Sequence, residues 1–125
     1  MNPKKILIVD DDTRNTFALS AVLKSRGYTC EVSGSMKEAI YLMDKKNDVG
    51  IILLDMMMPE MDGYEAIPVL KANPALQHIP VIAVTAQAMT GDREKCLAAG
   101  ADDYLSKPVN IDHLQNILNR YMNEK

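Results

Sequence analysis

The chain has 125 residues, of which 47% are hydrophobic and 25% charged, a composition typical of one ordinary globular domain. Its formal net charge of −3 argues against electrostatic binding to nucleic acid or to an anionic membrane, and no apolar run approaches the length of a membrane span. Cys30 and Cys96 lie far apart without metal-site spacing, so we expect reduced thiols in a cytoplasmic protein that forms one domain over residues 1–125.

Short apolar runs alternate with helical patterns along the whole chain. In chain order the patterns predict a strand over 5–9, a helix over 13–26, a strand over 28–32, a helix that opens at 35–38, a strand over 51–54, a helix over 62–71, a strand over 80–84, a helix from 90 or 91 to about 100, a strand over 103–105 and a helix over 111–121. On the first helix, Leu19, Val22 and Leu23 are expected to share the buried face.

Local signals mark several helix starts. Ser35 with Glu38, and Asp62 with Glu65, have the spacing of capping boxes, in which each side chain accepts from the other residue's backbone amide. One local rule is broken, because Pro68 falls inside the third helical pattern and removes a backbone hydrogen bond there. We therefore expect a kink or a late start in that helix.

Five short apolar strands that alternate with five helices predict an α/β domain. The expected architecture is a three-layer (βα)5, flavodoxin-like fold, with a parallel sheet covered by helices on both faces. A common strand order for such sheets is 2-1-3-4-5, in which the first and third strands are neighbours. Ligands bind these sheets at the carboxyl ends of the strands. Side chains at those ends are therefore the candidate site.

Polar side chains stand at the predicted strand ends, and four of them are acids. The residues at these ends are Asp10, Asp11, Asp12, Asp55, Thr85 and Lys107. A helix-capping role explains Asp12, which directly precedes the first helix. Capping does not explain Asp55, which ends the buried strand of the segment GIILLDMMMPEMDG, where desolvation penalises its charge.

Carboxylates that converge at one edge need a compensating charge. At about 4 Å each like-charge pair repels by about 4 kcal/mol at an effective dielectric near 20, so either one acid is protonated or a cation binds. Carboxylate oxygens favour Mg²⁺, whereas the DxDxDG loop of a calcium site is missing. Beside such an ion, Lys107 could neutralise a phosphoryl group and Thr85 could donate a hydrogen bond to it.

Four segments occur in order along the chain: ILIVDDD, ILLDMMMPEMDG, PVIAVTA and AGADDYLSKPV. Together they resemble the response-regulator receiver domains of the chemotaxis-regulator type, over the whole chain. The resemblance implies that Asp55 accepts phosphate, in the presence of Mg²⁺, from a histidine kinase or a histidine phosphotransfer protein. The segment DDDTRNTFALSAVLKSRGY is more similar to receivers attached to hybrid histidine kinases than to stand-alone regulators.

The resemblance also implies roles around the phosphoacceptor. Asp11 would bind Mg²⁺ directly and Asp10 directly or through water, with the main-chain oxygen of Met57 as a further ligand. Lys107 would pair with the phosphoryl group, and the Lys107–Pro108 peptide would be cis.

Further positions match those that switch and tune receivers. Thr85 and Tyr104 match the switch pair, in which the hydroxyl moves to the phosphate and the ring turns inward. Met57 and Gln87 occupy the tuning positions, and an apolar Met57 predicts slower self-dephosphorylation than asparagine there. An effector protein would then bind an output surface with these members: Ala88, Met89, Tyr104 and Val109.

Other functions on related chemistry fit less well. A haloacid-dehalogenase-type phosphatase needs an acid where Met57 stands, and the aspartates after the first strand would repel the phosphate of FMN in a flavin carrier. The alternative that stays open is a pseudo-receiver, a binding module that signals without phosphate. We expect a phosphoacceptor that assists its own phosphorylation and dephosphorylation rather than an enzyme, either a monomer or a phosphorylation-dependent dimer.

Overall fold

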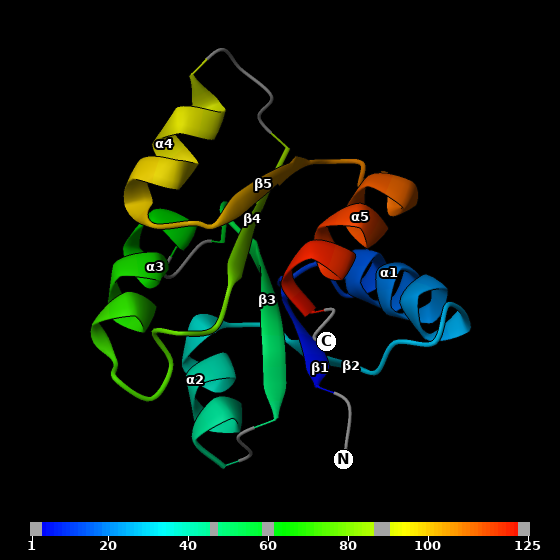
Figure 1. Ribbon diagram of the computed structural model, residues 1–125, viewed down its shortest axis with the longest axis horizontal. Helices are drawn as coiled ribbons and strands as arrows, with labels where there is room; N and C mark the ends of the chain where they lie inside the picture. The colour runs from blue at the N-terminus through cyan, green and yellow to red at the C-terminus, as the bar shows by residue number, and fades with distance from the viewer. Residues whose placement is uncertain (1–3, 46–47, 59–61, 87–90, 123–125) are drawn as a thin grey trace.

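The computed structural model describes residues 4–45, 48–58, 62–86 and 91–122. Within this part of the chain, strands and helices alternate as the sequence predicts (Figure 1). In chain order they are β1 (Lys5–Val9), α1 (Thr13–Ser25), β2 (Cys30–Ser33), α2 (Met36–Lys45), β3 (Val49–Asp55), α3 (Gly63–Ala72), β4 (Val81–Thr85), α4 (Asp92–Ala99), β5 (Asp103–Ser106) and α5 (Ile111–Met122).

The strands form one parallel sheet in the order β2-β1-β3-β4-β5. This order confirms the predicted flavodoxin-like fold and makes β1 and β3 neighbours. In their register Val9 pairs with Leu54. The next residue on each strand is an aspartate, so Asp10 and Asp55 leave the sheet side by side.

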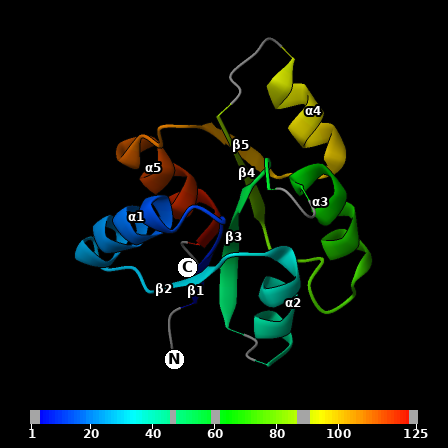
Figure 2. The ribbon, with the colours of Figure 1, turned by 180° about the vertical axis from the view of Figure 1, so that it is seen from behind.

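Helices cover both faces of the sheet. Figures 1 and 2 show α1 and α5 on one face and α2, α3 and α4 on the other. Each face of the sheet packs against its helices in a hydrophobic core, and successive strand residues alternate between the two cores. Leu7 and Val9 pack against α2 and α3, whereas Ile6 and Ile8 pack against α1 and α5. Burial of both faces explains why the strands are continuous apolar runs rather than alternating ones.

The two predicted capping boxes are formed to different degrees. At α3 the capping box is complete. The Asp62 side chain accepts a hydrogen bond from the Glu65 amide at 2.9 Å, and the Glu65 side chain accepts one from the Asp62 amide at 3.2 Å. At α2, Ser35 accepts from the Glu38 amide at 3.1 Å, but Glu38 accepts from the Gly34 amide at 3.2 Å. The second box is therefore present in a shifted form.

Two expectations about helices differ from the structure. The helix α3 begins at Gly63 and continues through Pro68, whose ring is exposed, so the predicted late start is wrong. On α1, Leu19 and Leu23 are buried but Val22 is 37% exposed. The buried stripe of α1 follows the spacing of three and four through Thr16, which leaves Val22 at its margin.

Cys30 is partly buried and Cys96 is buried, and both are free thiols. Within the described ranges no helix combines the length and the apolar character that crossing a bilayer requires.

Candidate functional site

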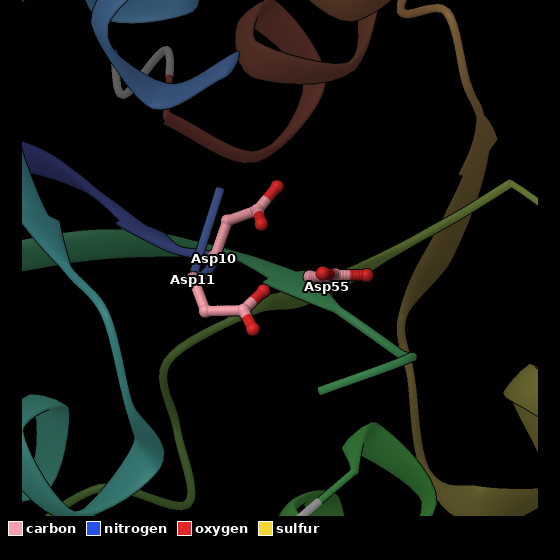
Figure 3. A group of neighbouring side chains, drawn as sticks. All are labelled: Asp10, Asp11 and Asp55. Carbon is pink, nitrogen blue, oxygen red and sulfur yellow. The ribbon is translucent and has the colours of Figure 1, made fainter. Parts of the chain in front are cut away.

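Three carboxylates meet at the carboxyl edge of the sheet. Oxygen atoms of Asp10, Asp11 and Asp55 all lie within 4.8 Å of one another. Figure 3 shows Asp10 and Asp11 next to each other after β1, with Asp55 beside them at the end of β3. Asp10 and Asp55 are 4% and 6% exposed, whereas Asp11 faces solvent. The predicted convergence of these acids is confirmed.

Lys107 brings a positive charge to the carboxylates. Its backbone amide donates to the carbonyl of Thr85 at 2.8 Å, which fixes the residue after β5 to the end of β4. From there its Nζ lies 3.2 Å from Asp10 Oδ2 and 3.6 Å from Asp55 Oδ1. The Lys107–Pro108 peptide is cis, as the resemblance implies. Thr85 is buried at the same edge, one residue beyond the partner of Asp55 in β4.

The charges at this edge do not balance, because three carboxylates face one ammonium group. Burial raises the pKa of Asp55, the amide of Met57 lowers it, and the charge of Asp10 raises it again, so that the net pKa lies above the ordinary value. Burial would raise the pKa of Asp10 too, but hydrogen bonds from the Asp12 amide, Asn15 and Lys107 together lower it. Of the two buried carboxylates, Asp55 is therefore the one whose negative charge is less well compensated.

The two buried carboxylates also act on Lys107. Burial alone would lower the pKa of Lys107, but the charges of Asp55 and Asp10 raise it above its ordinary value. The ammonium group therefore stays charged at neutral pH and remains available to an incoming anion.

Asn15 orients Asp10 and was not identified from the sequence. Its side-chain amide donates to Asp10 Oδ2 at 2.9 Å, while the Asp12 amide donates to Oδ1 at 2.9 Å. With Lys107 also on Oδ2, the remaining acceptor capacity of Asp10 lies on Oδ1. Asn15 lies in the first turn of the helix that follows Asp10, and nothing in the sequence beyond that place indicates its role. Asp12 caps the same helix by accepting from the Arg14 amide at 3.1 Å, as predicted.

The loop after Asp55 is closed against the start of α3. The Met57 amide donates to Asp55 Oδ1 at 3.1 Å, and the Gly63 amide donates to the Met56 carbonyl at 3.1 Å. A Cβ at Gly63 would lie only 2.9 Å from Met56 Cα, so glycine permits this close approach. Met56 and Met58 are buried and Met57 is half exposed, so two of the three methionines pack around the loop. The role of the Met57 main-chain oxygen as a ligand stays a prediction.

Tyr104 and Val109 are the described members of the predicted switch and output positions, and Val109 lines a small cavity together with Asp10 and Asp55. The Tyr104 hydroxyl donates to Asp92 in α4, and Val109 is partly buried against the α1 and α5 core. Gln87, Ala88 and Met89 lie outside the described residues. The predicted tuning and output positions therefore stay predictions.

The donor set suits a hard divalent cation. Carboxylate oxygens from two neighbouring strands converge within one coordination sphere, and one lysine leaves their negative charge unbalanced. A small, strongly hydrated ion such as Mg²⁺ prefers such oxygen ligands and usually binds only one or two carboxylates directly. Asp11, which is the most exposed of the three, is the one that such an ion can reach most easily.

Known proteins resemble this chain in sequence and in fold. The family model described as response regulator receiver domain matches residues 6–119. The chain is 40% identical over 116 residues to the signal transduction histidine-protein kinase BarA of Escherichia coli. The aligned segment makes up 93% of this chain but only 12% of BarA. The chain is also 34% identical over 122 residues to the polar-differentiation response regulator DivK of Brucella anthropi, and the alignment covers 98% of each protein.

A solved structure is similar over almost the same length. It is the receiver domain of a sensor histidine kinase from Pseudomonas aeruginosa, with a magnesium ion coordinated in its active site cleft. The two share 36% identity and a TM-score of 0.86, over 98% of this chain and 100% of the other. The carboxylates, the sheet order and these matches agree, and the chain belongs to the response regulator receiver domain family.

Proposed function

We propose that the chain is the phosphoacceptor module of a two-component phosphorelay. In this function Asp55 accepts a phosphoryl group from the phosphohistidine of a histidine kinase or of a histidine phosphotransfer protein. The observation that carries the proposal is the position of Asp55, a buried carboxylate at a strand end beside two further carboxylates and the ammonium group of Lys107.

Each group at the site has a part in the proposed transfer. An Asp55 oxygen attacks phosphorus, so an O–P bond forms while the P–N bond to the imidazole breaks and the imidazole keeps the electron pair. Lys107 pairs with the phosphoryl oxygens, and its present contacts to Asp10 and Asp55 hold its Nζ at that place. Mg²⁺, when held by Asp11 and Asp55 with Asp10 and the Met57 main-chain oxygen, would offset the negative charge of the carboxylates and of the phosphoryl group.

The acyl phosphate then acts as a switch. It adds about one negative charge and new acceptor oxygens at Asp55. Inverting a 1:99 equilibrium takes about 5.5 kcal/mol, and hydrogen bonds to charged groups contribute about 1.5–3 kcal/mol each. Bonds from the Thr85 hydroxyl and Lys107 would supply most of that difference. Thr85 and Tyr104 would move together, with Met57 and Gln87 setting how water reaches the phosphate.

The proposed module passes its state to another protein. A downstream effector would bind the surface of α4, β5 and α5 that includes Ala88, Met89, Tyr104 and Val109, and the chain would be a monomer or a phosphorylation-dependent dimer. It assists its own phosphorylation and dephosphorylation rather than acting on a separate substrate. We place it in the cytoplasm, where free thiols are stable.

Phosphorylation by a small donor tests the proposal. With Mg²⁺ and acetyl phosphate, intact mass spectrometry should show the gain of one phosphoryl group in the wild type and none in Asp55→Asn. Asp12→Asn is the matched control, because Asp12 caps α1 outside the carboxylate group and asparagine caps as well as aspartate. Its labelling should equal that of the wild type.

A wild type that stays unmodified, or an Asp55→Asn variant that is labelled equally, would contradict the proposal. The first outcome would favour the pseudo-receiver instead, a module with this fold that signals without phosphate.

A further inference from the structure

A second buried carboxylate lies outside the phosphoacceptor site. Asp92, the first residue of α4, is 7% exposed, and its carboxylate accepts hydrogen bonds from two hydroxyl groups. Tyr64 of α3 donates to its Oδ1 at 3.2 Å, and Tyr104 of β5 donates to its Oδ2 at 3.4 Å. Figures 1 and 2 show that α3 and α4 lie side by side next to β5. We call these three residues the tyrosine bridge, because one carboxylate joins three elements.

The Tyr64 end of the tyrosine bridge is held by further contacts. The hydroxyl of Tyr64 lies 3.7 Å from the Sγ of Cys96, and the Nζ of Lys95 lies 5.3 Å from the centre of its ring. Burial, together with Cys96 and Asp92, raises the pKa of Tyr64, and burial with the Asp92 charge raises that of Tyr104. Both hydroxyls therefore stay protonated and remain donors.

The tyrosine bridge also leads back to the phosphoacceptor. Tyr64 follows Gly63, whose amide bonds the Met56 carbonyl next to Asp55. At the other end, Tyr104 pairs with Ala83 in β4. A continuous set of contacts therefore runs from the loop after Asp55 to Tyr104 through α3 and α4, without passing through Thr85.

We propose that Asp92 and Tyr64 are positioning residues that hold Tyr104 against α4 and couple its orientation to the loop after Asp55. The proposal rests on the proposed function in one respect, since Tyr104 is there the residue that switches. A ligand shifts a conformational equilibrium only by its difference in affinity for the two states, and the coupling is reciprocal. The tyrosine bridge is formed in the resting protein, so weakening it should strengthen the binding of a phosphoryl analogue at Asp55.

The resting protein gives the first test, in which no phosphoryl analogue is present. NMR contacts between the Tyr104 ring and α4 should be strong in the wild type, weaker in Tyr64→Phe and weakest in Asp92→Leu, which is similar in size but accepts nothing. Asp92→Asn should restore most of them, because an amide can accept one hydroxyl and donate to the other. Tyr28→Phe is the matched control, since it removes a hydroxyl that lies 3.5 Å from Asn119 on the other face of the sheet.

Beryllofluoride with Mg²⁺ gives the second test. We expect its affinity to rise about tenfold in Asp92→Leu and about threefold in Tyr64→Phe, because the resting state loses hydrogen bonds to a charged acceptor. The double variant should gain no more than Asp92→Leu alone, because Tyr64 acts through Asp92. Tyr28→Phe should bind as the wild type does.

The two tests separate the inference from the function on which it rests. Unchanged Tyr104 contacts in Asp92→Leu, a weaker affinity in that variant, or additive gains in the double variant would overturn the tyrosine bridge. A wild type that binds no beryllofluoride at Asp55 would overturn the proposed function, and the resting-state contacts would still decide whether Asp92 and Tyr64 position Tyr104.

Discussion

The carboxylates at the carboxyl edge of the sheet and those at the amino edge of β4 and β5 are paired with cations in different ways. At the amino edge of β4 and β5, Asp102 Oδ2 accepts from Lys71 Nζ at 3.1 Å and from the Val81 amide at 2.8 Å. Its neighbour Asp103 lies 3.1 Å from Arg120. Each acid there has its own cation. At the carboxyl edge, by contrast, three carboxylates converge and, among the described residues, one lysine pairs with two of them, Asp10 and Asp55.

The difference separates charges that serve stability from charges that serve a function. A matched pair with a backbone hydrogen bond stabilises the fold by a modest amount. Unmatched, buried carboxylates destabilise it through repulsion and desolvation, unless a cation binds. Substitutions at the two edges should therefore act in opposite directions.

The largest expected effect comes from removing the shared cation. Lys107→Met should slow labelling by acetyl phosphate about 100- to 1000-fold, as loss of a charge-stabilising group does elsewhere. Lys71→Met removes a cation from the amino edge and should leave the labelling rate unchanged. The rates follow from intact mass spectrometry at several times. Equal rates for the two variants would show that the edges do not differ in function.

The next effect is linkage between Mg²⁺ and stability. At 100 times its dissociation constant, Mg²⁺ should raise the free energy of unfolding of the wild type by about 2.7 kcal/mol. Asp11→Asn should lose most of this gain and, without the ion, be slightly more stable than the wild type. Asp102→Asn should be less stable with or without Mg²⁺. Urea unfolding with EDTA or Mg²⁺ measures all three, and a destabilised Asp11→Asn without ion would contradict the repulsion.

A smaller effect concerns pH. Folding raises the pKa of Asp55, so the folded state holds the proton of this carboxyl group more tightly than the unfolded state does. The stability that this proton contributes is present below the ordinary pKa of about 3.8 and is lost as the pH rises through the raised pKa. Without Mg²⁺, Asp55→Asn should therefore stabilise the protein at pH 7 and progressively less as the pH falls toward that value. Asp10→Asn should instead destabilise the protein at pH 7, because the pKa of Asp10 is lowered, and this loss should stay constant down to about pH 3.8 and shrink only below it. Unfolding curves between about pH 3 and 7 measure both variants, and the same sign for both at pH 7 would contradict these pKa shifts.

The smallest expected effect is at Asn15. Asn15→Leu keeps the size of the side chain but removes the donor to Asp10 Oδ2, so Mg²⁺ should bind about three- to tenfold more weakly, the equivalent of one hydrogen bond. Asn119→Leu, on α5, is the control. Titration with Mg²⁺ followed by NMR measures the affinity, and an unchanged value would mean that Asn15 does not orient Asp10.

The fold and the convergence of the acids could be predicted from local patterns. Continuous apolar runs between helical patterns indicate a parallel sheet, and parallel strands place their carboxyl ends at one edge. Asp10 and Asp55 each stand directly after such a run, so their meeting requires only the strand order. Lys107 is similar, because it follows β5 by one residue.

Contacts that depend on how helices pack could not be predicted in the same way. Asn15 reaches Asp10 because α1 begins at a particular angle, and Asp92 meets Tyr64 and Tyr104 because α3, α4 and β5 come together. These side chains have no pattern in the sequence that indicates a shared partner. Val22 fits a helical period as well as Leu23 does, and only the packing of α1 leaves it exposed.

The most direct measurement locates the phosphoryl group on the chain. After treatment with Mg²⁺ and acetyl phosphate, borohydride would reduce an acyl phosphate to an alcohol, and peptide mapping would identify the reduced residue. We predict homoserine at position 55, formation of which requires Mg²⁺ and Lys107. Reduction at another aspartate, or none in a folded wild type, would contradict the central claim that the unbalanced edge is built around Asp55 as phosphoacceptor.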